Sequence, residues 1–446
     1  MTLGFRVNIF GAMPSPCVLS APRVFFNPPC LPERKRRTSG LRCGLMLLAL
    51  LAGCATAPRA RSPGPWDLRS LSKPPAVTWG STTGLVQELF YEGEPLNGKP
   101  TRVFAYLGRP ASGGDRNPAK TQPAIVLVHG GGGKAFKAWA EHWAQRGYVA
   151  LAMDLAGNGP NGRLPEGGPD QSDQAKFGNF TENEAGEMWT YHAVAAVLRG
   201  HSLVRSLPEV DAERVGVTGI SWGGYLTCIV AGVDPRFKVA VPVYGCGFLG
   251  DNSVWKDTSL ARMTTEARVL WLRLFDPSQY LGRVRRPILF VNGTTDFAYP
   301  LDSYQKSYRL VPAKWRHVSV AVNRPHGHIW TFPEVDAFVD GVLRVKPPLI
   351  RVGAPVVAGK RLTAELNRTA ALKEVSLCYT TDSGSWQKRR WQTVSARVEG
   401  RRLSAELPST RPLVAFLAIK DEGGRHLSSE HVELRANSRS DEPASH

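Results

Sequence analysis

Cysteine is scarce in this sequence, with seven residues in a chain of 446. Three of them fall within residues 1–53 and a fourth is Cys54, which leaves Cys228, Cys246 and Cys378 for the rest of the chain. An odd number of cysteines without regular spacing excludes a disulfide framework and a cysteine-based zinc site. The fold must therefore be stabilised by a hydrophobic core.

Acidic residues are also few, with 38 Asp and Glu against 56 Lys and Arg and a net charge of +18. Residues 1–53 hold seven of the basic residues and one glutamate, which leaves +12 for the remainder. A basic balance is typical of proteins that meet nucleic acid, anionic polymers or anionic membranes. The sequence has no zinc finger, aromatic RNA-binding motif or dense basic helix, so no nucleic-acid partner is expected.

Long hydrophobic runs are missing, and the apolar run at residues 45–51 is too short to span a bilayer. Basic residues precede this run and small residues follow it, which is typical of an export signal over residues 1–53. The ending Leu51-Ala52-Gly53-Cys54 resembles a bacterial lipobox, and this resemblance implies that Cys54 is the lipidated first residue of the mature chain. We therefore expect an exported lipoprotein held in the outer membrane or cell envelope by its lipid anchor. An ordinary signal peptide that is cleaved nearby is the alternative.

Residues 54–78 are rich in Pro, Arg and Ser and are predicted to form a tether. From 79 to 346, short apolar runs alternate with helical patterns, which predicts a mostly parallel sheet with helices on both faces, an α/β fold. The expected strands are 84–92, 100–107, 124–128, 148–153, 215–220, 239–243, 288–292 and 318–322. The expected helices are 135–146, 188–203, 225–231 and 333–343.

Two long segments, 157–183 and 248–280, interrupt this alternation after strands, and each is expected either to build a lid or only to cover the sheet. Residues 349–435 change to short alternating runs with regular turns, which predicts a small immunoglobulin-like β-sandwich. Trp386 and Trp391 in this part fit either a packed core or a platform for sugars. The polar tail 436–446 is expected to be loose.

The segment Gly219-Ile220-Ser221-Trp222-Gly223 lies between an apolar strand pattern and a helical pattern. A strand-to-helix turn this tight needs glycines on both sides, and it presents the serine hydroxyl at the edge of the sheet. Ser221 is therefore the candidate nucleophile.

A serine hydroxyl needs a neighbouring base, and the base needs a carboxylate that orients it. Asp296 follows the strand 288–292 and is the candidate carboxylate, with a structural Asx-turn as its alternative role. The last strand is followed by two histidines, of which His326 is the expected base and His328 the alternative. A His-x-His pair also occurs in metal sites, but no third ligand with zinc spacing accompanies it, so no metal is expected.

The negative oxygen that forms during acyl transfer needs two hydrogen-bond donors. Trp222 is expected to supply one backbone N–H, and the glycine run after the strand 124–128 to supply the other, at Gly131. His129 is expected to hold this glycine loop in shape.

The order of the oxyanion loop, Ser221, Asp296 and His326 resembles that of the α/β-hydrolase fold. Within it, the sequences around His129-Gly130-Gly131, Ser221 and His326 are similar to those of acetylxylan esterases and dienelactone hydrolase-like enzymes. This resemblance implies a serine carboxylic-ester hydrolase without a cofactor, which removes acyl groups, often acetyl, from small-molecule or polysaccharide esters. Ser221 stands where dienelactone hydrolases have cysteine, so dienelactone is not the expected substrate.

Two other functions compete with this expectation. One is a serine peptidase of the prolyl oligopeptidase type, but the roughly fifty residues before the first sheet strands cannot form the propeller of those enzymes. The other is a non-catalytic surface binding protein on a hydrolase scaffold.

Overall fold

The computed structural model describes residues 64–111, 121–328, 330–344 and 346–435. The predicted signal segment 1–53, Cys54, the first part of the tether and the tail 436–446 lie outside these residues. Among the described helices, none is both long and apolar enough to cross a membrane.

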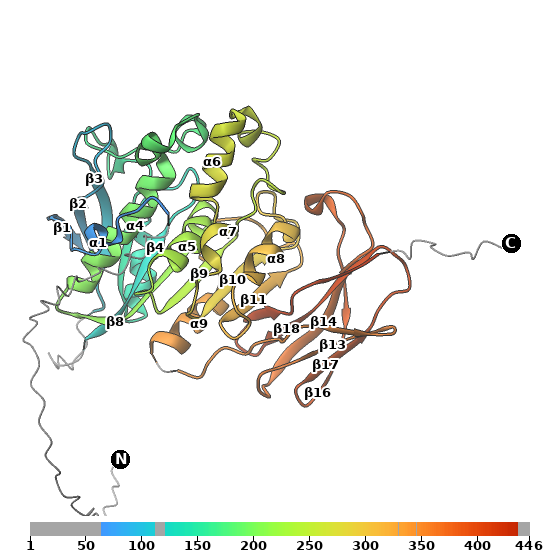
Figure 1. Ribbon diagram of the computed structural model, residues 1–446. Helices are drawn as coiled ribbons and strands as arrows, with labels where there is room; N and C mark the ends of the chain where they lie inside the picture. Colours follow the sequence, from blue (N-terminus) through green and yellow to red (C-terminus); the bar gives the residue numbers. More distant parts are fainter. Residues whose placement is uncertain (1–63, 112–120, 329, 345, 436–446) are drawn as a thin grey trace, which may run out of the picture. The chain divides into compact units, whose positions relative to one another are not determined.

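A nine-stranded sheet lies at the centre of the larger part of the molecule, with the order β1-β2-β3-β5-β4-β8-β9-β10-β11 (Figure 1). Strands β5, β4, β8, β9, β10 and β11 pair in parallel, and β1, β2 and β3 are added antiparallel at one edge. The prediction of a mostly parallel sheet is confirmed. The bounds are β1 Val77–Thr83, β2 Val86–Glu92, β3 Arg102–Gly108, β4 Gln122–Val128, β5 Val149–Met153, β8 Val210–Ile220, β9 Val239–Val243, β10 Ile288–Gly293 and β11 Arg316–Ala321.

Helices cover both faces of this sheet. On one face α2 and α9 lie together, joined by ion pairs from Arg146 to Asp336 and Asp340. On the other face α4 and α5 pack side by side against β4 and β8. The longer helices are α2 Lys137–Gln145, α4 Trp189–Ser206, α5 Trp222–Val233, α6 Thr265–Phe275, α8 Leu301–Arg309 and α9 Pro333–Leu343. The shorter ones are α1 Leu68–Leu71, α3 Asp173–Phe177 and α7 Ser278–Leu281.

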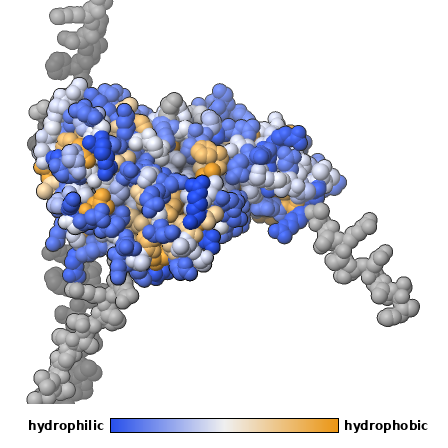
Figure 2. Space-filling model, turned by 90° about the horizontal axis from the view of Figure 1, so that it is seen from above, coloured by the Kyte–Doolittle hydropathy of each residue, from blue (hydrophilic) through white to orange (hydrophobic). Residues whose placement is uncertain are grey.

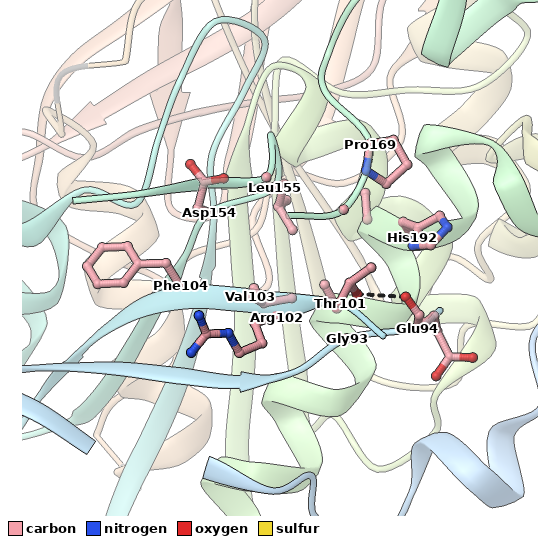
Figure 3. Close-up of a pocket in the computed structure, with 14 residues that line it drawn as sticks. Gly93, Glu94, Thr101, Arg102, Val103, Phe104, Asp154, Leu155, Pro169 and His192 are labelled. Carbon is pink, nitrogen blue, oxygen red and sulfur yellow. Dashed lines mark hydrogen bonds between the residues drawn. The ribbon is translucent and has the colours of Figure 1, made fainter. Parts of the chain in front are cut away.

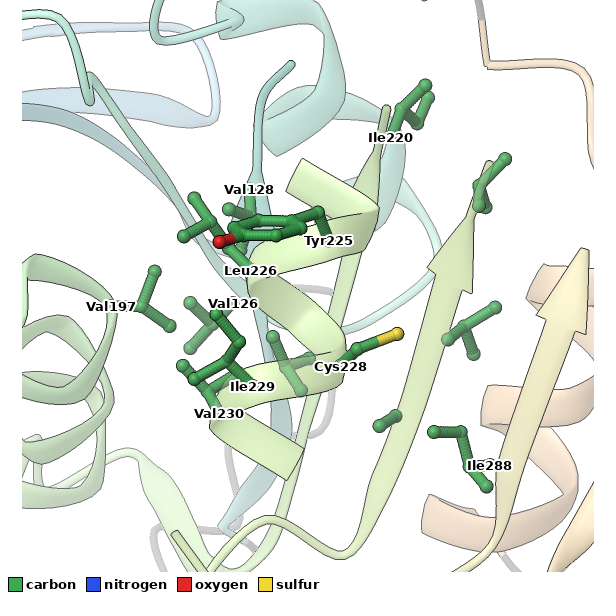
Figure 4. Close-up of a cluster of buried hydrophobic side chains, with 14 of the residues drawn as sticks. Val126, Val128, Val197, Ile220, Tyr225, Leu226, Cys228, Ile229, Val230 and Ile288 are labelled. Carbon is green, nitrogen blue, oxygen red and sulfur yellow. The ribbon is translucent and has the colours of Figure 1, made fainter. Parts of the chain in front are cut away.

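The apolar run in β4 is buried on both sides, as its sequence predicts. Val126 and Val128 lie against Leu226 and Ile229 of α5, and all four are at most 1% exposed (Figure 4). Burying a side chain of this size contributes roughly 1.5–3 kcal/mol. This packing fixes the start of α5, the helix that follows Ser221, against the sheet.

The prediction that residues 54–78 form a tether is wrong for residues 64–78, the part that the structure describes. Trp66 and Leu71 are each only 1% exposed, and the Trp66 indole N–H donates to the Tyr191 carbonyl at 3.0 Å. Residues 64–78 therefore belong to the folded unit. Trp66 is a single aromatic residue among many Pro, Arg and Ser residues, so the composition of this segment does not indicate that it packs on the domain.

Residues 349–435 form two antiparallel sheets, which confirms a small β region at the C-terminal end. One sheet has the order β12-β13-β17-β16, and the other has the order β15-β14-β18-β19 with β20 beside β18. Their inner faces share a buried cluster that includes Leu362, Leu403, Leu377 and Leu417. The bounds are β12 Val356–Ala358, β13 Arg361–Glu365, β14 Leu372–Thr380, β15 Gln392–Ser395, β16 Arg397–Glu399, β17 Arg402–Glu406, β18 Leu413–Asp421, β19 His426–Ser428 and β20 Val432–Leu434.

Trp386 and Trp391 are packed in this region and form no open platform. Their exposed fractions are 6% and 9%, and Trp391 lies 5.5 Å from the Phe416 ring.

The C-terminal strands also contact the large sheet. The main-chain N–H of Val320 in β11 donates to Ser428 Oγ of β19 at 3.0 Å. The predicted boundary between 346 and 349 and the immunoglobulin-like topology stay predictions.

His317 on β11 gives the fold a pH dependence. Its ring packs 4.8 Å from Phe338, and burial, with Arg351 nearby, lowers its pKa to about 4. Because the unfolded chain has the ordinary pKa of about 6.5 and binds more protons between these values, stability falls as the pH falls through this window. We expect a loss of about 1–2 kcal/mol at pH 5 relative to pH 7 from this group. Thermal unfolding at both pH values should show a smaller difference in His317→Gln than in the wild type, and equal differences would contradict this assignment.

Candidate active site

Ser221 occupies the turn between β8 and α5. Its backbone has φ 62° and ψ −120°, a conformation that costs energy for any residue other than glycine. The Ser221 N–H donates to the Val243 carbonyl at 2.8 Å, which ties the turn to the neighbouring strand β9. This strained turn is the geometry that the sequence predicts for a nucleophile elbow.

The glycines around Ser221 are required by close backbone contacts. A Cβ atom on Gly223 would lie 1.9 Å from the Val128 carbonyl oxygen, and one on Gly219 would lie 2.4 Å from the Gly223 carbonyl oxygen. Neither position has room for a side chain, so the turn can approach β4 only with glycine at both places.

Asp296 and His326 meet at the same end of the sheet, although thirty residues separate them. The His326 Nδ1–H donates to Asp296 Oδ2 at 2.7 Å. The other carboxylate oxygen accepts the N–H groups of Ala298 and Tyr299, so the carboxylate is fixed from both sides. A proton on Nδ1 leaves Nε2 free to accept another, which is the tautomer that a general base needs.

Two aromatic side chains hold the His326 ring in place. Tyr244 stacks on it with ring centroids 4.5 Å apart, and Phe297 lies 4.8 Å away. The Tyr244 hydroxyl also donates to the Pro325 carbonyl at 2.8 Å. Sequence reasoning missed both residues, although their positions directly after β9 and Asp296 are at strand ends, where site residues gather.

His328 differs from His326 in its partners. In the described chain it has no carboxylate partner, and neither imidazole is hydrogen-bonded to Ser221. The hydrogen bond between nucleophile and base is often long or absent until substrate is bound, so its absence here does not argue against a triad. The pairing with Asp296 favours His326 over His328 as the base.

His129 holds the glycine loop in shape, as expected. Its Nδ1–H donates to the Gly130 carbonyl, and its Nε2 accepts the Leu155 N–H, both at 2.8 Å. One nitrogen donates and the other accepts, so the imidazole is neutral, in agreement with burial that lowers its pKa. This histidine therefore has no free nitrogen for catalysis.

The two expected oxyanion donors are neighbours in the structure. A Cβ atom on Gly131 would lie 2.8 Å from Trp222 Cδ1. The Gly132 N–H donates to Gln171 Oε1 and the Gly133 N–H to the Gly130 carbonyl, whereas the Gly131 N–H has no backbone partner in the described chain. Trp222 is the first residue of α5, where a helix leaves its N–H groups unpaired. Neither N–H group has a backbone hydrogen-bond partner in the described chain, so both are available as donors.

Both long interrupting segments contribute aromatic rings that pack on Trp222. Trp255, from residues 248–280, lies 4.5 Å from its ring, and Phe177, from residues 157–183, lies 5.8 Å away. The segments therefore pack on the residue that follows Ser221. The surface seen in Figure 2 is largely hydrophilic with small apolar patches, and the exposed large apolar side chains include Phe297 at 56%.

A small hollow lies between β3, the end of β5 and α4, lined by residues such as Asp154, Thr101 and His192 (Figure 3). Asp154 Oδ2 and His192 Nε2 are buried there and have no partner in the described chain. The space of about 20 Å³ has room for a water molecule, which would satisfy such polar atoms. We assign this hollow a structural role.

The described residues contain no cluster of three or more His, Cys, Asp or Glu that could hold a metal ion. The sheet order, the elbow and the Asp296–His326 pair are together those of an α/β-hydrolase of the serine type.

Comparison with known proteins agrees with this class. Residues 84–282 match the family model of acetyl xylan esterases (AXE1). This range includes Ser221 and the glycine loop and ends before Asp296. The predicted resemblance to acetylxylan esterases, which are carboxylic ester hydrolases, is confirmed at this level.

Individual relatives are distant. Acetyl esterase Axe7A of Xylanibacter ruminicola is 23% identical over 52% of this chain and 54% of its own length. The uncharacterized peptidase YuxL of Bacillus subtilis is 25% identical over 46% of this chain and 30% of its own length. The solved acetyl xylan esterase from Paenibacillus sp. R4 is 21% identical, covers 59% of this chain and 87% of its own chain, and has a TM-score of 0.46. The chain thus spans about half the length of the acetyl esterase and about a third of the length of YuxL.

Proposed function

We propose that this protein is a serine carboxylic-ester hydrolase that removes small acyl groups, acetyl above all, from small-molecule or carbohydrate esters. The observation that carries the proposal is the 2.7 Å bond between His326 and Asp296 at the end of the sheet that presents Ser221 on its strained turn. Each of the three groups has the partner or the backbone conformation that its part in acyl transfer requires.

The proposed reaction gives each of these groups one part. His326 Nε2 takes the proton of Ser221 Oγ as the oxygen attacks the ester carbonyl, and Asp296 stabilises the imidazolium that forms. The N–H groups of Gly131 and Trp222 hold the negative oxygen of the tetrahedral intermediate. The imidazolium then gives its proton to the leaving alcohol. A water molecule, activated by His326, cleaves the acyl-enzyme and releases the acid.

The packing around Trp222 supports a short acyl group. Trp222 follows Ser221 and packs against Trp255 and Phe177, so bulky rings fill the space on that side of the turn. The names of the matched family and of the acetyl esterase of Xylanibacter ruminicola support acetyl in particular.

The peptidase alternative is supported by the similarity to YuxL. Hydrolysis of p-nitrophenyl acetate, p-nitrophenyl octanoate and an aminoacyl-p-nitroanilide separates the candidates. We expect kcat/KM for the acetate to exceed that for the octanoate by about tenfold or more, because extra methylene groups are rejected by a filled pocket. The wild type should cleave the anilide no faster than the Ser221→Ala variant does. Comparable rates on the anilide would favour a peptidase, and no turnover of any substrate would favour a binding protein.

Membrane anchoring through Cys54 and export to the cell envelope belong to the same proposal and are supported by the lipobox-like sequence. Three acyl chains on one cysteine would hold the protein stably, since two or more lipid signals are needed for lasting attachment. In an expression host that processes lipoproteins, we expect the wild type in the detergent phase of a Triton X-114 extraction and Cys54→Ser outside it. Equal partition of the two would argue for an ordinary signal peptide.

A further inference from the structure

His328 lies beside Ser221 but has no part in the proposed triad. A Cβ atom on Gly130 would be 2.4 Å from His328 Nε2 and 2.9 Å from Ser221 Cβ. The same position is 2.7 Å from the Ile220 carbonyl oxygen, so Gly130 packs closely between His328 and the turn that holds Ser221, and only glycine fits there. His328 Nε2 is buried and has no hydrogen-bond partner in the described chain. A buried polar atom without a partner is uncommon, and this one lies beside Gly130 of the glycine loop, close to Ser221.

The rings of the two histidines have different neighbours. The His326 ring is held by Tyr244, on the side of Asp296. The His328 ring lies 6.4 Å from Phe136, the residue before α2 that follows the glycine loop. The planes of the two imidazoles are inclined by 72°. His328 is therefore on the side of the oxyanion loop, where the ester carbonyl oxygen must lie.

His328 is suited to donate a hydrogen bond and is poorly suited to act as a base. Burial, with the imidazoles of His326 and His129 nearby, lowers its pKa, so the ring is neutral at pH 7 and carries one N–H. In the described chain it lacks the carboxylate that orients a general base. A neutral donor fixed beside a developing negative charge stabilises the transition state without reorganisation.

We propose that His328 donates a hydrogen bond from Nε2 to the oxyanion, as a third donor beside the N–H groups of Gly131 and Trp222. This inference rests on the proposed function, because it requires acyl transfer at Ser221. It makes His328 a catalytic residue and explains why an unpartnered nitrogen is kept buried next to the glycine loop. It also requires glycine at position 130, since any side chain there would collide with His328 Nε2 and Ser221 Cβ.

The test compares His328→Leu, which removes the donor, with His328→Gln, whose amide N–H can replace Nε2, and with the matched variant His326→Gln. For p-nitrophenyl acetate we expect His328→Leu to lose about 10²-fold in kcat with little change in KM, as for removal of one oxyanion donor. His328→Gln should recover activity to within about tenfold of the wild type, whereas His326→Gln should be nearly inactive. The acid limb of the pH–rate profile should be the same in His328→Gln and in the wild type. The loss in His328→Leu should be equal for p-nitrophenyl acetate and ethyl acetate.

Several outcomes would overturn the proposal. Activity of His328→Leu within threefold of the wild type would leave only a structural role, and a loss in His328→Gln as large as in His326→Gln would make His328 the base. A loss confined to ethyl acetate would place its donor on the leaving oxygen. Thermal unfolding of each variant shows whether it is folded, and a misfolded His328→Leu is replaced by His328→Phe.

A second readout separates this inference from the proposed function. A fluorophosphonate reacts with an activated serine whatever the natural ester, and its P=O oxygen occupies the oxyanion position. The rate of Ser221 labelling should fall about 10²-fold in His328→Leu and recover in His328→Gln. If the wild type is labelled but cleaves no acetate ester, the proposed substrate is wrong while the labelling rates still decide the role of His328. Unchanged labelling in His328→Leu would contradict that role.

Discussion

Replacing Ser221 by alanine is expected to lower kcat/KM for p-nitrophenyl acetate by about 10⁴-fold to 10⁶-fold. The change removes the attacking oxygen. The oxyanion donors and the rest of the substrate site remain, and they account for the residual rate. The loss should appear in kcat, because the hydroxyl contributes little to ground-state binding.

The fold should tolerate this change. Ser221 is 7% exposed and its side chain makes no hydrogen bond in the described chain, so alanine removes one oxygen without leaving a partner unsatisfied. Thermal unfolding within about two degrees of the wild type is expected. Ser206→Ala, at the far end of α4, is the control, since its hydroxyl donates only to the Leu203 carbonyl. Activity of Ser221→Ala equal to that of Ser206→Ala would remove Ser221 from the mechanism.

Replacing Asp296 by asparagine is expected to lower kcat by about 10⁴-fold with little change in KM. The amide oxygen can still accept the N–H groups of Ala298 and Tyr299, so the loop keeps its shape. The amide group that replaces Oδ2 carries N–H donors and no charge, so it forces the wrong tautomer on His326 and cannot stabilise the imidazolium.

Asp302 provides a matched control in the same region of the chain. Its carboxylate accepts hydrogen bonds from Asn252 Nδ2 and from the Ser303 N–H and touches neither histidine in the described contacts. Asp302→Asn should therefore keep kcat within a few-fold of the wild type. Equal losses in the two variants would mean that Asp296 acts through loop stability alone.

The sequence predicted the framework of the site because the relevant signals are local. Apolar runs of five or six residues gave β4, β9 and β10, and the alternation with helical patterns gave the parallel sheet. Parallel strands end at a common edge, so residues that follow them had to meet there. This reasoning predicted that Asp296 and His326 lie close together, although the sequence itself shows no contact between them.

The parts that the sequence did not predict depend on contacts between distant segments. Trp66 is buried against Tyr280 and Phe275, which lie more than two hundred residues later, and nothing in its neighbourhood marks it as a core residue. The support of His326 by Tyr244 joins the ends of two different strands. The separate surroundings of His326 and His328 arise only in the folded chain, so the sequence could rank His326 above His328 but could not show which partners each of them has.

Mass mapping of the fluorophosphonate adduct tests the central claim most directly, namely that Ser221 is an activated nucleophile served by His326 and Asp296. The account predicts one adduct per chain, located on Ser221 in the peptide map, and labelling slowed at least about 10³-fold in Asp296→Asn and His326→Gln. An adduct on another residue, no adduct on the folded wild type, or labelling of Ser221 at the same rate in all three proteins would contradict it.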